Sequence, residues 1–251
     1  MRRLINVGVT VLIFLLFSCS GKKINYAELS PEQQLEAAKK LFEKEKYYAA
    51  QEQFRMIVLR NPGNVIVDQA QYYLAESYYH EEKYIMAIEE YEKLIRSLPN
   101  SPYIDDAYYK VGLCYYELSP GYALDQEYTY KAIAQFESFL TKYPDSKLRK
   151  QVLEKLQECH NKLAKKVYKT GELYRKMNYL RAAVISYKDV VDEYSDSEFV
   201  PNSLYWIVKC NIAMDNIEEA QEYYNKLKSS YPGTIWASRA SEEVQKIDNI
   251  Q

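Results

Sequence analysis

The chain has 251 residues with 33 basic and 35 acidic side chains, and this balance gives no indication of a nucleic acid as the main partner. A hydrophobic content of 47%, with 27 tyrosines, supplies material for a sizeable core. Seven glycines and eight prolines are few for a β-sandwich or for an α/β enzyme with phosphate loops. The composition therefore predicts an all-α protein.

The first 18 residues have the organisation of a secretory signal peptide, with a basic start and an apolar run over 4–17. The run ends in Leu-Phe-Ser-Cys, which resembles the bacterial lipobox. We expect cleavage before Cys19, attachment of several acyl chains to this cysteine and a lipidated linker over 19–30. Ser20 after the cysteine resembles the outer-membrane sorting pattern of many lipoproteins. An ordinary secretory signal with a chance cysteine is the alternative.

A repeated pattern follows, in which an alanine precedes an aromatic residue by four positions and a proline by twelve. A small residue stands twelve positions before the alanine at Ala38, Ala75 and Gly171, with Val208 in the last unit. These are marks of the 34-residue tetratricopeptide repeat. The repeated triplets are Ala50, Phe54 and Pro62; Ala87, Tyr91 and Pro99; Ala132, Phe136 and Pro144; Ala183, Tyr187 and Ser195; Ala220, Tyr224 and Pro232.

The spacing divides the chain into five helix pairs, over 31–64, 68–101, 105–146, 164–197 and 201–234. The third unit needs Gly112 as its small residue, twenty positions before Ala132, and so implies an eight-residue insertion within 118–130. The joint 147–163 has no Gly or Pro and a helical apolar spacing, which predicts one long helix from about 146 to 176. A capping helix is expected over 235–250. The predicted fold is an all-α, right-handed tetratricopeptide solenoid, with an N-terminal half over 31–146, a helical connector over 147–163 and a C-terminal half over 164–251.

In such a solenoid, the first helix of each unit lines a concave groove, and its repeat positions 5 and 12 face that groove. In the third unit these positions hold Tyr109 and Tyr116, whereas Tyr108 and Tyr115 fall at core positions. The predicted groove forms an aromatic ladder suited to aromatic-rich peptides. The alternative is that the chain's own N-terminal segment or neighbouring helices cover the ladder. The predicted peptide-groove residues are Leu35, Phe42, Tyr72, Tyr79, Tyr109 and Tyr116; the fourth and fifth units carry Tyr168, Arg175, Tyr205 and Ile212 at these positions.

No catalytic, cofactor or metal site is expected. The chain has no Gly-rich phosphate loop and no nucleophile elbow, and its two histidines leave little room for acid-base chemistry. The adjacent pair Cys159 and His160 has no second pair to complete a metal site. We expect buried, reduced thiols at Cys114, Cys159 and Cys210, and a solvated basic face at Lys162, Lys165, Lys166 and Lys169.

Two tracts resemble the BamD family of outer-membrane assembly lipoproteins. The first resembles that family's third repeat, insertion included, and the second matches the family as well. Ser195 departs from the family's proline, and Lys165 and Val167 depart from its frequent acidic residues. The matching residues are Asp106–Tyr109, Gly112, Leu113, Tyr116, Asp125, Gln126, Ala132, Phe136, Phe139, Tyr143, Pro144 and Ser146 in the first tract, and Leu163, Ala164, Gly171, Tyr174, Lys176, Tyr179, Ala182, Ala183 and Tyr187 in the second.

The resemblance implies a non-enzymatic lipoprotein subunit of the β-barrel assembly machine, anchored in the bacterial outer membrane and facing the periplasm. It implies that the C-terminal half docks on the POTRA domains of a BamA-like barrel protein. The N-terminal groove is then expected to bind targeting segments of unfolded outer-membrane proteins, and other assembly-machine lipoproteins are expected partners. The alternative is another periplasmic tetratricopeptide scaffold lipoprotein, for envelope division or secretion.

Overall fold

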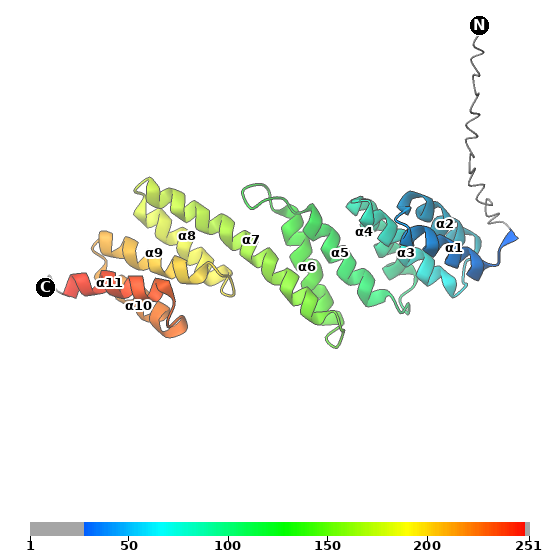
Figure 1. Cartoon of the computed structure of the whole chain (residues 1–251). Helices are drawn as coiled ribbons and strands as arrows, with labels where there is room; N and C mark the ends of the chain where they lie inside the picture. Colours follow the sequence, from blue (N-terminus) through cyan, green and yellow to red (C-terminus); the bar gives the residue numbers. More distant parts are fainter. Residues whose placement is uncertain (1–27, 249–251) are drawn as a thin grey trace, which may run out of the picture.

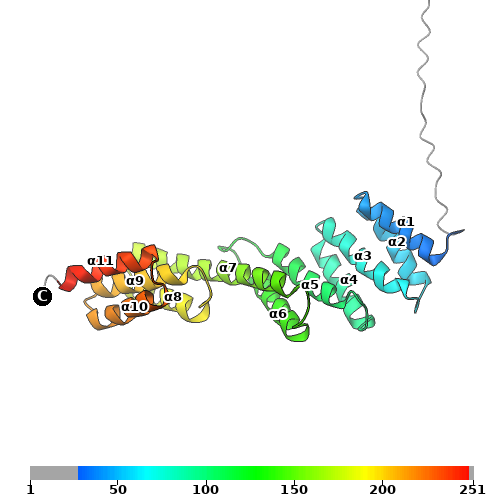
Figure 2. The same cartoon turned by 60° about the horizontal axis from the view of Figure 1, so that its bottom comes forward.

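The computed structural model describes residues 28–248, with side chains through 246, so Cys19 lies outside the described residues. This part of the chain forms eleven α-helices in one elongated row, with α1 and α2 at one end and α10 and α11 at the other (Figures 1 and 2). The predicted all-α fold is confirmed. The helices are α1 (Pro31–Glu43), α2 (Tyr47–Arg60), α3 (Ile66–His80), α4 (Tyr84–Ser97), α5 (Ile104–Leu118), α6 (Glu127–Lys142), α7 (Arg149–Lys176), α8 (Leu180–Glu193), α9 (Val200–Ala213), α10 (Ile217–Ser230) and α11 (Ile235–Asp248).

Small residues of the odd-numbered helices pack against large aromatic residues of the helices that follow them. A Cβ atom on Gly112 of α5 would lie 2.4 Å from the ring of Phe136 in α6, and one on Gly171 of α7 would lie 2.8 Å from the ring of Tyr187 in α8. Both rings are fully buried. The small residue is therefore needed for the close approach of the two helices, which explains the pattern found in the sequence.

Four tight turns join the two helices of a unit, and each contains a residue in the left-handed region. Glu45, Glu82, Asn178 and Asp215 have φ values of 57°, 58°, 63° and 62°. Each follows the last turn of an odd-numbered helix, where this conformation lets the chain reverse direction. The third unit has the predicted insertion at this point, since residues 119–126 separate α5 from α6.

The insertion is attached to α7 by lysine side chains. The ammonium of Lys162 donates to the hydroxyl of Ser119 at 2.8 Å, and that of Lys166 donates to the carbonyl oxygen of Leu124 at 2.7 Å. The ammonium of Lys165 lies 4.9 Å from the ring centroid of Tyr122. The expectation of a solvated basic face is therefore wrong for these three lysines, because their ammonium groups contact two oxygens and a ring of the insertion.

The long helix expected between the third and fourth units is α7, which spans 28 residues. Its first half packs with α5 and α6 around Val152 and Cys159, and its second half packs with α8 and α9 around Ala164 and Tyr168. One continuous helix thus belongs to two hydrophobic clusters. The C-terminal helix α11 packs against α9 and α10 through Ala240 and Val244, as predicted for a cap.

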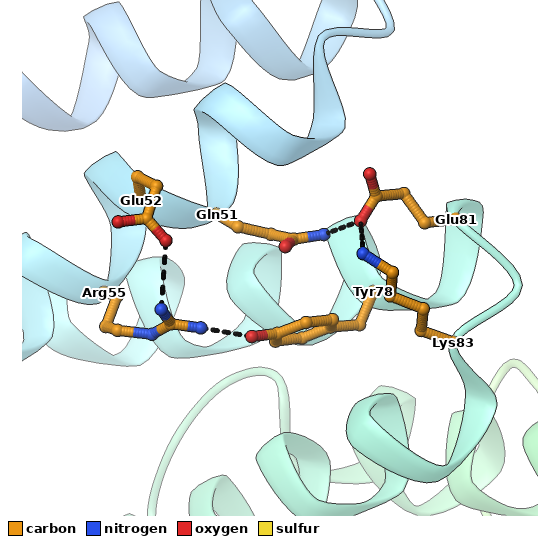
Figure 3. A network of polar contacts seen from close by, with 6 residues as sticks. All are labelled: Gln51, Glu52, Arg55, Tyr78, Glu81 and Lys83. Atoms are coloured by element: carbon orange, nitrogen blue, oxygen red, sulfur yellow. Dashed lines mark hydrogen bonds and ion pairs between the residues drawn. The ribbon is translucent and has the colours of Figure 1, made fainter.

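A polar network fixes α2 against α3 (Figure 3). The guanidinium of Arg55 donates to the hydroxyl of Tyr78, and the amide of Gln51 donates to the carboxylate of Glu81. Glu52 lies 3.0 Å from Arg55 and completes this side of the interface. The buried Tyr78 ring is therefore held at both its apolar and its polar end.

The three cysteines of the described part are buried and unpaired, as predicted. Burial raises the pKa of Cys114 to about 12 and the pKa values of Cys159 and Cys210 to about 11. Thiols with such pKa values stay protonated at neutral pH and act as small apolar core groups. Within residues 28–248 no helix has the length and apolarity needed to cross a membrane.

Candidate functional site

The first two units and the turn before α5 carry a partly buried aromatic surface, here defined as Phe42, Tyr72, Tyr79 and Tyr103. Phe42, at the end of α1, makes edge contacts with Tyr73 and His80 of α3, with ring centroids 5.3 Å apart in both pairs. These contacts place the C-terminal end of α1 against the middle and end of α3. Phe42 is thus fixed by α3 but retains some exposed area.

Tyr72 of α3 is stacked on Tyr103, with ring centroids 4.9 Å apart and an interplanar angle of 20°. Burial raises the pKa of the Tyr72 hydroxyl, and the charge of Glu76 raises it further. The phenol is therefore neutral at any physiological pH. Tyr103 precedes α5 and is not among the residues predicted from the sequence; its position next to the predicted start of the third unit is the signal that points to it.

Tyr79 is the penultimate residue of α3, and the ammonium of Lys110 sits 4.6 Å from its ring centroid. Lys110 also pairs with the buried carboxylate of Glu76 at 2.8 Å. The hydroxyl of Tyr91 donates to the same carboxylate, so Glu76 links α3, α4 and α5. Burial raises the pKa of the Tyr79 hydroxyl, with a contribution from the charge of Glu117. The ring is held in place by charged neighbours that sequence spacing did not reveal.

Two of the six predicted groove residues belong to the core instead. Tyr109 is 8% exposed and lies between Phe136 and Phe139, with ring centroids 6.2 and 6.4 Å away. Leu35 is 5% exposed in the cluster formed by α1 to α5. The prediction that these two side chains line an open groove is therefore wrong.

The physical reason at Tyr109 is the first half of α7, which an ordinary repeat does not have. Val152 and Cys159 of this segment join the same cluster as Tyr109 and Leu113. The same repeat position is also buried in the first, fourth and fifth units, at Leu35, Tyr168 and Tyr205, so burial at this position is general in this solenoid. At Tyr109 the segment that covers it is the first half of α7. The sequence indicated the long helix and gave no sign of which face of α5 it covers.

Tyr116 forms the border between the aromatic surface and α7. Its hydroxyl donates to the carboxylate of Glu158, and the ammonium of Lys155 lies 4.3 Å from its ring centroid. Burial raises the pKa of this hydroxyl, and the hydrogen bond to Glu158 raises it further. Tyr116 retains a partly exposed ring whose orientation is fixed by the connecting helix. Neighbouring helices therefore cover Tyr109, as the alternative interpretation held, but leave Tyr116 partly exposed.

The other two tyrosines of the third unit, Tyr108 and Tyr115, are partly exposed rather than core residues. The hydroxyl of Tyr108 accepts a hydrogen bond from Lys142 at 2.7 Å, and Tyr115 stacks on Tyr128 of α6. The predicted roles of Tyr108 and Tyr109 are thus reversed, because Tyr109 is buried in the core and Tyr108 is partly exposed.

No group of three or more potential metal ligands occurs in the part of the chain that the structure describes. His160 is hydrogen-bonded to Asp196 through Nδ1 at 2.9 Å and ties α7 to the turn before α9. His80 stacks on Tyr47 with ring centroids 5.0 Å apart. The described arrangement offers rings, hydroxyls and paired charges, which are groups for recognition of a peptide.

Five helix pairs that stack in a row, joined by a continuous helix and closed by a cap, define a protein of the tetratricopeptide solenoid class. Residues 27–227 match the model of the YfiO family, described as outer membrane lipoprotein. The chain belongs to this family, and the BamD resemblance seen in the sequence is confirmed.

One similar protein is the outer membrane protein assembly factor BamD of Rickettsia prowazekii (strain Madrid E), which is 29% identical over 209 residues, or 83% of each chain. Among solved structures, the TPR2AB domain of yeast Sti1 in complex with an Hsp90 peptide is 14% identical, with a TM-score of 0.47 over 87% of this chain and 86% of that one. A thermophilic tetratricopeptide protein of Thermus thermophilus is 19% identical, with a TM-score of 0.37 over 85% of this chain and 98% of that one.

Proposed function

We propose that this protein is a non-enzymatic subunit of an outer-membrane β-barrel assembly machine. The family match over 27–227 carries the proposal, and the relative named as an outer membrane protein assembly factor supports it. In this proposal, acylated Cys19 anchors the chain in the outer membrane, and the solenoid faces the periplasm. The C-terminal half, residues 164–251, docks on the POTRA domains of a BamA-like barrel protein.

The first two units bind targeting segments of unfolded outer-membrane proteins in this proposal. The aromatic surface supplies partly exposed rings at Phe42, Tyr72 and Tyr79, with Tyr116 at its border. Rings held by their neighbours lose little entropy when an aromatic side chain stacks on them. Lys110 lies over the Tyr79 ring of this surface, and its charge is paired with Glu76.

The complex is tested by isolation of the tagged full-length protein from detergent-solubilised outer membrane, followed by mass spectrometry. We expect a POTRA-bearing barrel protein in comparable molar amount. Recovery of division or secretion components in its place would contradict the assembly role and leave the solenoid architecture intact.

The peptide surface is tested separately with the substitution Tyr79→Ala. Loss of one aromatic contact of about 1 kcal/mol predicts roughly fivefold weaker binding of a peptide that ends in phenylalanine. Tyr48→Ala is the matched control, since Tyr48 is 67% exposed on α2 and lies outside the aromatic surface. Equal binding by Tyr79→Ala and the unchanged protein would contradict the assignment of this surface.

A further inference from the structure

The C-terminal half contains an arginine whose charge is not paired. Arg175, in the last turn of α7, places its guanidinium carbon 3.8 Å from the ring centroid of Trp206 in α9. Its Nε is buried and has no hydrogen-bond partner, and no carboxylate of residues 28–246 lies within ion-pair distance of it. A partly buried guanidinium stacked on an indole is therefore left without a counter-ion.

The neighbouring cations differ from Arg175 in this respect. Lys169 of α7 pairs with Glu172 at 2.6 Å, and Lys209 of α9 pairs with Glu243 of α11 at 3.0 Å. Partial burial of a guanidinium costs free energy that a cation–π contact offsets only in part. The same guanidinium presents a planar set of donors that fits a carboxylate in a bidentate manner.

The surroundings of Arg175 are rigid and aromatic. The indole Nε1 of Trp206 donates to the hydroxyl of Tyr168 at 3.2 Å, which fixes the plane on which the guanidinium lies. On the same helix, Tyr205 contacts both Trp206 and Trp236, with ring centroids 5.0 and 5.5 Å apart. Lys209 lies 5.9 Å from the Trp206 ring, with its charge paired to Glu243. Aromatic area and positive charge thus occur together.

Arg175 also occupies a position that faces the groove in the repeat register, equivalent to Tyr79 in the second unit and Tyr116 in the third. The guanidinium lies close to the hydroxyl of Tyr187 of α8, although neither that hydroxyl nor Arg175 Nε makes a hydrogen bond of good geometry, and this polar contact and the positive charge oppose the rise in the hydroxyl's pKa that burial causes. It therefore stands where α7, α8 and α9 meet. The fourth unit therefore has a cation where the first three units have an aromatic residue, and the fifth unit has Ile212.

We propose that Arg175 and Trp206 form a second peptide-binding site, which takes an extended acidic segment with an aspartate or glutamate flanked by aromatic residues. The carboxylate pairs with the guanidinium, and the flanking rings pack beside Trp206, which is partly exposed, whereas the buried Tyr205 supports Trp206 from within the core. Charge complementarity selects this occupant, since one carboxylate supplies the counter-ion that the fold leaves out. This site goes beyond the proposed function and depends neither on the barrel subunit nor on the aromatic surface of the first two units.

Tryptophan fluorescence tests the site directly, because the chain contains only two tryptophans. Trp236→Phe leaves Trp206 as the sole reporter in full-length protein held in dodecyl maltoside. The probe is the blocked peptide acetyl-Gly-Phe-Glu-Phe-Gly-amide, and its control is the same peptide with Gln in place of Glu. We expect a saturable change with the Glu peptide that weakens as salt is added, and at least about tenfold weaker binding of the Gln peptide.

Variants of the same reporter protein complete the test. Arg175→Gln is expected to lose the preference for Glu over Gln, whereas Arg175→Lys retains part of it as a point charge without the planar donors. Arg181→Gln is the matched control, because Arg181 is exposed on α8 and outside the site, and it should bind as the parent does. Equal affinity for the two peptides, no binding of either, or unchanged discrimination in Arg175→Gln overturns the proposal. If circular dichroism shows that Arg175→Gln does not fold, the comparison of the Glu and Gln peptides on the parent and on Arg175→Lys still tests the proposal.

Discussion

The close contact between Gly112 and Phe136 permits a quantitative test of the repeat packing. In Gly112→Ala, the new Cβ would lie 2.4 Å from the Phe136 ring, closer than atoms of a packed core approach one another. Overpacking of this kind costs about 1–3 kcal/mol, whereas Gly to Ala inside a helix contributes roughly 1 kcal/mol of helix propensity. The net expectation is a loss of about 1 kcal/mol, within a range of roughly 0–2 kcal/mol.

The assay is thermal unfolding of the full-length protein in dodecyl maltoside, followed by circular dichroism at about 222 nm. For a chain of this size, a loss of about 1 kcal/mol lowers Tm by roughly 2–4 °C. The matched control is Gly121→Ala, since a Cβ there meets no atom within 4 Å and the backbone is not in the left-handed region. This control should stay within about 0.5 kcal/mol of the parent.

A second substitution separates the contact from other effects of the alanine. Phe136→Leu alone should destabilise, because it removes volume from a fully buried position. Combined with Gly112→Ala, it leaves room for the new methyl group, so the double variant should be more stable than the sum of the single changes predicts. A Gly112→Ala protein more stable than the parent, or strictly additive effects in the cycle, would refute the packing argument.

Three further outcomes are expected. Burial, and then the charges of Asp105 and Glu76, raise the pKa of Asp106 in the folded state. Because the unfolded chain ionises this carboxyl more readily, stability falls as pH rises from 3.8 through the raised pKa of the folded state. Asp106→Asn should therefore raise Tm at about pH 7.5, and the gain should vanish below pH 3.8; a gain independent of pH would contradict this. The three buried thiols should resist Ellman's reagent at about pH 8 in the folded protein and react in about 6 M guanidinium chloride, because their raised pKa values and burial suppress the thiolate. Lys162→Met should release the 119–126 insertion and increase its cleavage by chymotrypsin after Tyr122 or Leu124 under native conditions, whereas the exposed Lys150→Met should not; equal cleavage of both would show that the lysine does not hold the loop.

Much of the fold follows from the sequence because repeats are local. The small residue and the aromatic residue that meet it lie within one unit, so their spacing alone predicts the contacts of Gly171 with Tyr187 and of Gly112 with Phe136. The absence of Gly and Pro over 147–163 was enough to predict one continuous α7. These features depend on helical periodicity and nearest-neighbour packing, which can be inferred from the spacing of residues in the sequence.

The candidate site was less predictable, because it depends on contacts between residues far apart in the chain. Tyr109 and Tyr116 occupy the same faces of α5 as Tyr72 and Tyr79 do of α3. Helix α7 nevertheless buries Tyr109, and its Glu158 accepts a hydrogen bond from the hydroxyl of Tyr116, 42 residues away in the chain. No periodicity within α5 indicates where a later helix will pack.

The sequence by itself determined the helix pairs, the insertion, the connector and the cap, because each depends on interactions within about forty residues of chain. The tertiary structure alone decided which aromatic rings stay accessible and which charges are paired. Lys162 and Arg175 illustrate the difference: both are basic residues of α7, but one is satisfied by the insertion loop and the other stacks on Trp206 with no carboxylate partner in the described chain. Side-chain exposure and charge pairing are properties of the assembled solenoid, since they depend on what each neighbouring helix brings to the same point in space.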